Sequence, residues 1–159
     1  MAIELVKQYF KQYDRDKDIL EFSTSSATVL MAANALNTDC ARIAKTLAFK
    51  YEETCLLVVT AGDTKIDNSK FKQEFGIKPS MISAEQVLEL TGHAVGGVCP
   101  FALINKDIKV FTDVSLKRFE TVFPACGSSN SAIELTPDEL SNYSNSIKWI
   151  DVCKISEEN

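Results

Sequence analysis

A glycine-rich bend followed by a proline most constrains how this chain can fold. The segment from Thr91 to Leu103 reads Thr-Gly-His-Ala-Val-Gly-Gly-Val-Cys-Pro-Phe-Ala-Leu. Glycine adopts backbone conformations that other residues avoid, and Pro100 restricts its own φ and the residue before it. Such a bend can direct several N–H groups at one small polar ligand, which is the geometry of an oxyanion site. It is also typical of a tight turn before a buried strand, which the apolar residues after Pro100 predict.

Length and composition indicate one ordinary globular domain. The 159 residues fit a single domain over residues 1–155, followed by a frayed tail at 156–159. The chain is 45% hydrophobic and 25% charged, as in typical soluble proteins. No apolar run approaches the ~20 residues of a membrane span, and the N-terminus lacks the pattern of a secretory signal. We therefore expect a cytoplasmic protein.

The cysteines and the histidine argue against disulfides, metals and cofactors. The five cysteines are scattered, without a Cys-x-x-Cys pair. An odd number in an apparently intracellular chain is not typical of a disulfide framework, so we expect reduced core residues. His93 is the only histidine, and no spacing typical of metal ligands recurs. We expect no cofactor and no metal.

Charge is concentrated at the C-terminal end. The net charge is −5, but residues 22–132 carry eleven acidic and eleven basic side chains. Residues 133–159 carry six acidic side chains against Lys148 and Lys154, which gives −4 there. Broad, sequence-independent nucleic-acid binding requires a basic domain. This composition does not provide one.

Hydrophobic periodicity and turn residues predict an α+β domain. Helices are expected over the first dozen residues, from a cap at Ser25 or Ser26 to Leu36, and over 69–75, 83–90 and 137–143. Strands are expected over 19–24, 46–51, 56–60, 101–104, 109–112, 122–123, 132–135 and 149–152. Two hairpins are expected, one joining 46–51 to 56–60 and one joining 101–104 to 109–112. Such a pattern favours a largely antiparallel sheet with surrounding helices.

Two more segments accompany the glycine bend. Ala44-Lys-Thr-Leu47 opens a predicted strand, and Ala125-Cys-Gly-Ser-Ser-Asn-Ser-Ala-Ile-Glu-Leu135 is a loop of small residues before another. In this order and spacing, the three segments resemble the YbaK/prolyl-tRNA synthetase-associated domain family, from about Ser25 to Val152. The resemblance implies a mixed, barrel-like sheet with surrounding helices. It also implies hydrolysis of the ester between a wrong amino acid and tRNA, most often proline tRNA, here by a free-standing member.

The resemblance also implies a set of site residues. Catalytic roles fall on Lys45, Gly96, Gly97 and Val98, and substrate-binding roles on Thr46, His93, Pro100, Gly127, Ser128 and Ser129. The expected partner is the tRNA acceptor end, and a need for prolyl-tRNA synthetase is left open. The family's free-standing cysteinyl-tRNA(Pro) deacylases carry Gly-Lys in the second loop and Asp before Ile-Glu-Leu. This chain has Ser128-Ser129 and Ala132 there, which leaves the cleared amino acid open between cysteine and alanine.

The chemistry of an aminoacyl ester suits these residues. The ester is already activated, so hydrolysis mainly requires stabilisation of the charge that develops on the carbonyl oxygen. Backbone amides of Gly96, Gly97 and Val98 are candidate donors, and the loss of one such donor typically costs ~10²–10³ in rate. Lys45 can hold a phosphate of the acceptor end or lie near the ester oxygen, and we favour the phosphate. The terminal ribose hydroxyl can take up a proton.

Several residues allow a second interpretation. Cys99 could be a nucleophile if a base activated it. His93 is either a general base or a structural histidine at a helix end. Asp113 is either a turn cap or a pocket acid, and Thr24 to Ser26 either cap a helix or line the pocket rim. Two further functions stay open: a noncatalytic tRNA- or synthetase-binding module, and a thiol-dependent hydrolase.

Overall fold

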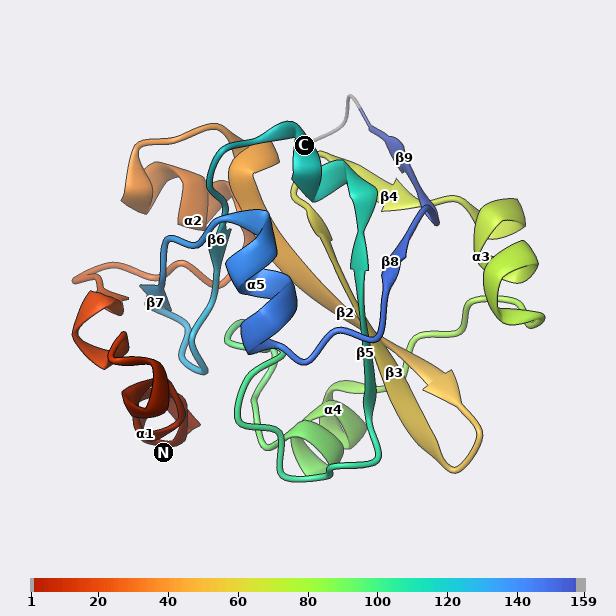
Figure 1. Cartoon of the computed structure of the whole chain (residues 1–159), viewed down its shortest axis with the longest axis horizontal. Coiled ribbons are helices and arrows are strands. Elements are labelled where there is room, and N and C mark those ends of the chain that lie inside the picture. The colour runs from red at the N-terminus through yellow and green to blue at the C-terminus, as the bar shows by residue number, and fades with distance from the viewer. Residues whose placement is uncertain (1, 157–159) are drawn as a thin grey trace.

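The computed structural model describes residues 2–156, and Figure 1 shows a central sheet with helices around it. The helices are α1 (Ala2–Phe10), α2 (Val29–Leu36), α3 (Asn68–Phe75), α4 (Ala84–Thr91) and α5 (Pro137–Tyr143). The strands are β1 (Leu20–Glu21), β2 (Ile43–Tyr51), β3 (Thr54–Ala61), β4 (Thr64–Ile66), β5 (Lys109–Asp113), β6 (Phe123–Pro124), β7 (Ser131–Ala132), β8 (Trp149–Ile150) and β9 (Cys153–Ile155). Of the predicted tail, residues 157–159 lie outside the described residues.

The main sheet is mixed and has the order β6-β2-β3-β5-β8. β2 and β3 form the predicted antiparallel hairpin, with Ala44 opposite Ala61 and Tyr51 opposite Thr54. The other three pairings, β2–β6, β3–β5 and β5–β8, are parallel. Two small antiparallel pairs, β1–β7 and β4–β9, complete the fold. The α+β class with a mixed sheet is confirmed, and the antiparallel share of the main sheet is smaller than expected.

The second predicted hairpin is wrong. Residues 101–104 form no strand, and β5 pairs in parallel with β3 instead. The apolar character of this run serves packing: the fully buried Phe101 ring meets the Phe10 ring edge to face, with centroids 4.8 Å apart. The backbone turns back to α4, where Ile104 N–H donates to the Thr91 carbonyl at 3.3 Å.

Local capping signals explain where the helices begin. Ser83 and Gln86 form a capping box at α4, and Thr136 and Glu139 form one at α5, which begins with a proline. The start of α2 differs from the prediction, because Thr28 is the cap and not Ser25 or Ser26. The hydroxyls of those serines donate instead to the carbonyl of Ser129, both at 3.3 Å.

The main sheet is covered on both faces. Alternate side chains of β3 enter two separate cores, because successive strand residues point to opposite faces. Leu57 and Val59 pack with α1, α4 and the glycine bend, whereas Leu56 and Val58 pack with α3 and β9. Ala44 and Ala48 of β2 belong to the first face, and Phe49 belongs to the second. The same alternation fixes the faces of Lys45 and Thr46.

A helix that crosses a lipid bilayer needs about 20 predominantly apolar residues. None of the helices within residues 2–156 has the length and apolarity needed to cross one.

Candidate functional site

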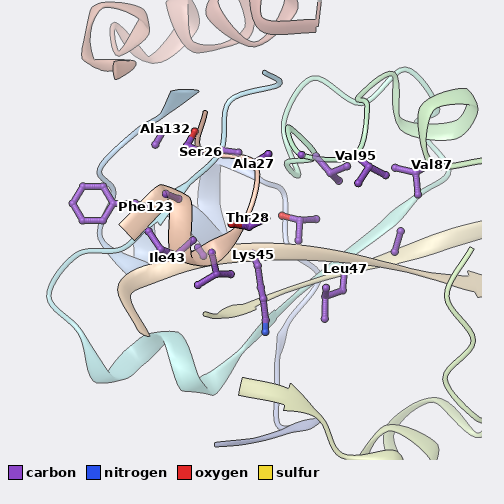
Figure 2. Close-up of a pocket in the computed structure, with 18 of the residues that line it drawn as sticks. Ser26, Ala27, Thr28, Ile43, Lys45, Leu47, Val87, Val95, Phe123 and Ala132 are labelled. Carbon is purple, nitrogen blue, oxygen red and sulfur yellow. The ribbon is translucent and has the colours of Figure 1, made fainter. Parts of the chain in front are cut away.

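A cavity of about 280 Å³ lies at the edge of β2. Its wall combines residues from the start of α2, from β2 and α4, from the glycine bend and from the β6–β7 region. Figure 2 shows Ala27, Thr28, Val87 and Val95 around this space. Of the predicted site residues, the structure places four in the wall: Lys45, Thr46, Gly96 and Val98. All three sequence segments therefore meet at or beside one cavity.

The glycine bend supplies backbone donors to this wall. Gly96 has φ +99°, in the left-handed region that favours glycine, and a Cβ there would lie 3.1 Å from the Ala27 Cβ. Gly97 N–H donates to the Ala94 carbonyl at 3.0 Å and so closes the turn. No acceptor within residues 2–156 takes a hydrogen bond from the Gly96 or Val98 N–H. Two of the three predicted amides thus remain available to a ligand.

The loop of small residues supports the bend without lining the cavity. Gly127 N–H donates to the Gly97 carbonyl at 3.0 Å, and a Cβ on Gly97 would lie 2.7 Å from the Ser128 nitrogen. Two loop backbones therefore touch where no side chain fits. The Ser128 hydroxyl donates to Ser131 Oγ at 2.7 Å. The wall itself is formed by the neighbours of the predicted residues Gly127, Ser128 and Ser129, namely Ala125, Ser131 and Ala132.

The segment before α2 also joins this site. Ser26 N–H donates to the Ser129 carbonyl at 2.5 Å, which ties the segment to the small-residue loop. Ser26 lines the cavity, as does Thr28, which caps α2 by accepting from Met31 N–H at 3.2 Å. Of the two interpretations of Thr24 to Ser26, the structure therefore places Ser26 at the pocket.

Thr46 carries an unpaired polar group within the cavity wall. Its side chain shares the face of Ala44 and Ala48, both of which also line the cavity. The Thr46 hydroxyl is buried and has no hydrogen-bond partner among the described residues. A buried hydroxyl without a partner costs free energy, so such a group marks a place for a ligand.

Lys45 contributes to the wall, but its ammonium lies on the other side of β2. The ammonium donates to the Thr64 carbonyl of β4. Figure 2 shows the Lys45 side chain pointing away from Thr28 and Val95. Burial lowers the pKa of this ammonium. The structure does not bring the charge of Lys45 to the glycine bend, and its contact with a phosphate or an ester oxygen stays a prediction.

His93 and Pro100 lie outside the cavity wall. The fully buried His93 ring places Nε2 2.7 Å from the Phe101 carbonyl, so Nε2 carries the proton. Nδ1 is buried and unpaired within residues 2–156, and burial lowers the pKa of the ring. Pro100 is buried beside it and lines a separate hollow with Tyr9. This arrangement matches the structural interpretation of His93.

The alternative roles of Cys99 and Asp113 find little support in the geometry. Cys99 Sγ lies 3.5 Å from His93 Nε2, which is already protonated and bonded, and burial raises the pKa of the thiol to about 12. Asp113 accepts N–H bonds from Ser115 and Val152, each at 3.0 Å, and is 1% exposed. Asp113 is therefore a buried cap that holds a turn.

Most of the wall was not identified from the sequence. The missed residues are small or apolar and come from five helices and strands and from the segments between them: Ile43, Leu47, Met81, Ile82, Val87, Val95 and Phe123, together with six alanines. Each resembles an ordinary core residue in its own element. They are recognised as cavity residues only because the fold brings them together at the edge of β2. No local sequence signal predicts this arrangement.

Comparison with known proteins identifies the family. Residues 24–143 match the model of the aminoacyl-tRNA editing domain. The chain is 57% identical over 155 residues to the uncharacterized protein YwhH of Bacillus subtilis (strain 168), covering 97% of this chain and 98% of that one. It is 25% identical over 128 residues to a proline–tRNA ligase of Bacillus cereus (strain AH820). That match covers 79% of this chain but only 22% of the ligase.

Solved structures agree with the family match. A crystal structure described as a candidate trans-editing enzyme for prolyl-tRNA synthetase superposes with a TM-score of 0.86. The two chains are 25% identical, and the match covers 96% of this chain and 97% of the other. The predicted resemblance is thereby confirmed. The three segments around the β2 cavity lie within or beside the matched range, and the chain belongs to the aminoacyl-tRNA editing domain family.

Proposed function

We propose that this chain is a trans-editing deacylase that hydrolyses the ester of mischarged tRNA, with cysteinyl- or alanyl-tRNA(Pro) as its substrate. The observation that carries the proposal is the pair of unpaired amides, Gly96 and Val98, at the wall of the β2 cavity. Two free N–H donors in one wall can stabilise the oxyanion that forms when water attacks the ester carbonyl. Membership of the editing-domain family makes an aminoacyl ester the expected ligand.

The cavity favours a small amino acid. Six of its wall residues are alanines: Ala27, Ala32, Ala44, Ala48, Ala125 and Ala132. Their short side chains leave a space of about 280 Å³, lined by few polar groups. One missing or added methylene is worth only a modest factor in such a pocket, so discrimination among small side chains is limited. Both alanine and cysteine fit this description.

Hydrolysis in this geometry needs three contributions. The glycine bend fixes the donors before the substrate arrives, so no reorganisation is needed as charge develops. The wall of the cavity holds the ester in one orientation relative to these donors. A hydroxyl of the terminal ribose, next to the ester, can accept the proton of the attacking water while it passes its own proton to the leaving ribose oxygen. Lys45 acts in this scheme through β2, because its ammonium is held at Thr64.

A noncatalytic tRNA- or synthetase-binding module is the second candidate. It is favoured by the neutral charge balance of residues 22–132 and by the direction of the Lys45 ammonium, away from the bend. Such a module would bind charged tRNA and leave its ester intact. Prolonged incubation of alanyl-tRNA(Pro) with saturating protein separates the two candidates directly.

The deacylase proposal is tested by changing the bend. Gly96→Ala adds a methyl group 3.1 Å from Ala27 Cβ at a residue with φ +99°, and so moves the amide donors. We expect deacylation of alanyl- and cysteinyl-tRNA(Pro) to fall by ~10²-fold or more, as for the loss of an oxyanion donor. Seryl- and prolyl-tRNA(Pro), measured alongside, define which amino acids the cavity accepts.

Gly76→Ala is the matched control. Gly76 also has a positive φ, +76°, but no atom lies within 4 Å of an added Cβ, and the residue ends α3 far from the cavity. Both variants therefore bear similar backbone strain, about 1 kcal/mol or more. We expect Gly76→Ala to retain activity. Equal activity of the Gly96→Ala protein, or no hydrolysis of any charged proline tRNA by the unmodified protein, would remove the deacylase proposal.

A further inference from the structure

One edge of β2 has no strand paired with it where it borders the cavity. On its other edge β2 pairs with β3 along eight consecutive residues. On the cavity edge, β6 pairs only with Ile43 and Ala44, and a bridge from Met81 covers Phe49. Between these two covers, no segment of the described chain pairs with residues 45–47 on this edge. An uncovered strand edge presents unpaired N–H and C=O groups.

The hydrogen bonds beside the gap show which residue faces it. Ala48 C=O accepts from Ile82 N–H at 3.3 Å, and Lys50 N–H donates to the Ser80 carbonyl at 2.7 Å. The polar groups of both residues thus point to the cavity edge. Because a residue's N–H and C=O share one edge and the direction alternates along a strand, Thr46 points to the same edge. Thr46 therefore directs its N–H and C=O to the cavity edge, and its hydroxyl is buried without a partner among the described residues in the same wall.

The cavity contains both kinds of partner that an aminoacyl ester requires. The amides of Gly96 and Val98 are donors without an acceptor among the described residues, and they suit the ester carbonyl. The α-ammonium of the aminoacyl group has three donors and requires acceptors. No Asp or Glu is among the residues that line the cavity. An ammonium bound here must therefore use carbonyl or hydroxyl oxygens.

We propose that the uncovered edge of β2 at Thr46 recognises the α-ammonium of the aminoacyl group, through the Thr46 carbonyl and hydroxyl oxygens. The proposal rests on the deacylase function proposed above and assigns a second anchor to the same substrate. The ester carbonyl lies at the glycine bend and the ammonium at β2, so the scissile bond is held between two fixed points. A strand edge is a rigid support for such a contact, because β3 holds it along its other side.

Replacement of the ammonium in the substrate tests the carbonyl contact, which side-chain substitution cannot remove. Alanyl-tRNA(Pro) is compared with lactyl-tRNA(Pro), in which a hydroxyl replaces the ammonium. Each rate is divided by the spontaneous hydrolysis rate of the same ester, because the ammonium also activates the ester chemically. Hydrogen bonds to charged groups contribute about 1.5–3 kcal/mol, so we expect the enzymatic enhancement to be ~10- to 100-fold lower for the lactyl ester. Equal enhancements would overturn the proposal.

Thr46 variants test the hydroxyl contact. Thr46→Val keeps the shape and removes the hydroxyl, and Thr46→Ser is the matched control that keeps it. We expect Thr46→Val to lower kcat/KM for alanyl-tRNA(Pro) by ~10-fold and to reduce the alanyl-to-lactyl ratio, and Thr46→Ser to recover much of both losses. The melting temperature of Thr46→Val should not fall, because an unpaired buried hydroxyl is removed. An unchanged ratio in Thr46→Val would overturn the role of the hydroxyl.

A binding measurement separates this proposal from the deacylase function. Amide-linked alanyl- and lactyl-tRNA(Pro) analogues resist hydrolysis, so their dissociation constants report recognition alone. Tighter binding of the alanyl analogue by ~10-fold or more, without any hydrolysis of the ester, would support the edge contact and refute the deacylase. Equal binding of the two analogues, together with rapid ester hydrolysis, would refute the edge contact and support the deacylase.

Discussion

At the scale of single residues, Cys99 shows how burial decides reactivity. The thiol is fully buried, its neighbour His93 donates to Phe101 rather than accepting a proton, and the pKa of the thiol is raised to about 12. A thiolate is therefore rare at neutral pH. We expect Cys99→Ser to deacylate alanyl-tRNA(Pro) at the unmodified rate, at a stability cost of about 1–3 kcal/mol for a buried hydroxyl. Loss of turnover in a folded Cys99→Ser protein would instead favour a thiol-dependent hydrolase.

His93 predicts how stability depends on pH. Burial lowers its pKa below the ordinary value near 6.5, so the unfolded chain binds a proton more readily than the folded one. The contribution is complete above about pH 6.5 and is lost as the pH falls toward the lower, folded-state pKa. His93 is the only histidine. We expect the urea concentration at the unfolding midpoint to decrease when the pH is lowered from 7.5 to 5.5.

His93→Gln provides the control for that pH dependence. Its amide can still donate to the Phe101 carbonyl, but it carries no titratable group in this range. The variant should show a much flatter profile from pH 7.5 to pH 5.5 in the same urea titration. A slope as steep as that of the unmodified protein would mean that other groups cause the effect.

At the scale of elements, the sequence predicted what local signals determine. The caps at Ser83 and Thr136 place the starts of α4 and α5, because capping depends on residues three positions apart. The β2–β3 hairpin could also be predicted locally, because a short connection joins its two strands. The parallel pairing of β5 with β3 could not be predicted, since nothing near residues 109–113 reports a partner fifty residues away. The run 101–104 has the apolarity of a strand but serves packing around Phe101.

The candidate site also combines features that short motifs predict with features that tertiary packing determines. The backbone donors at Gly96 and Val98 and the position of Thr46 were predicted, because each depends on a short motif whose residues line the wall. The direction of the Lys45 side chain was not, because strand alternation and the neighbouring β4 decide it. Gly127 to Ser129 were predicted as wall residues, whereas the structure places them against Gly97. Tertiary packing decides which way a side chain points and what it contacts. A short motif indicates only that its residues lie near the site.

The link between β2 and β4 allows a test of how Lys45 acts. Lys45→Met keeps most of the side chain and removes the ammonium that bonds to the Thr64 carbonyl. We expect a stability loss of about 1 kcal/mol and a fall in kcat of ~10-fold or more, because the edge of β2 at the cavity is less firmly held. Lys65→Met, at an exposed lysine next to Thr64, is the control and should change neither.

The salt dependence of tRNA binding distinguishes the two roles of Lys45. A positioning role leaves the slope of log K against log[salt] unchanged in Lys45→Met. A direct phosphate contact would reduce the slope by about 1, because one fewer counterion is released. Amide-linked alanyl-tRNA(Pro) allows this titration without hydrolysis. A reduced slope would restore the phosphate contact that the sequence predicted.

At the scale of the whole molecule, charge limits how the protein can hold tRNA. The chain carries −5 overall, and the balance of residues 22–132 is neutral. Several basic side chains are already paired with acidic ones, such as Arg118 with Asp63 and Lys148 with Glu74. The eleven acidic side chains of residues 22–132 offset the eleven basic ones, so the net charge of this region does not attract an extended phosphate backbone. We therefore expect recognition to concentrate on the acceptor end, whose charged terminus is the proposed ligand of the cavity.

This limit predicts a weak salt dependence. Two or three phosphate contacts lower affinity by about 10- to 40-fold between 50 and 200 mM salt, whereas six to ten lower it by ~10³–10⁵. We expect the smaller effect when amide-linked alanyl-tRNA(Pro) is titrated by fluorescence anisotropy at several salt concentrations. A minihelix that keeps only the acceptor stem should bind nearly as well as full-length tRNA, because the remaining contacts lie at the terminus. A loss of a thousandfold would reveal a basic surface that the charge balance does not predict.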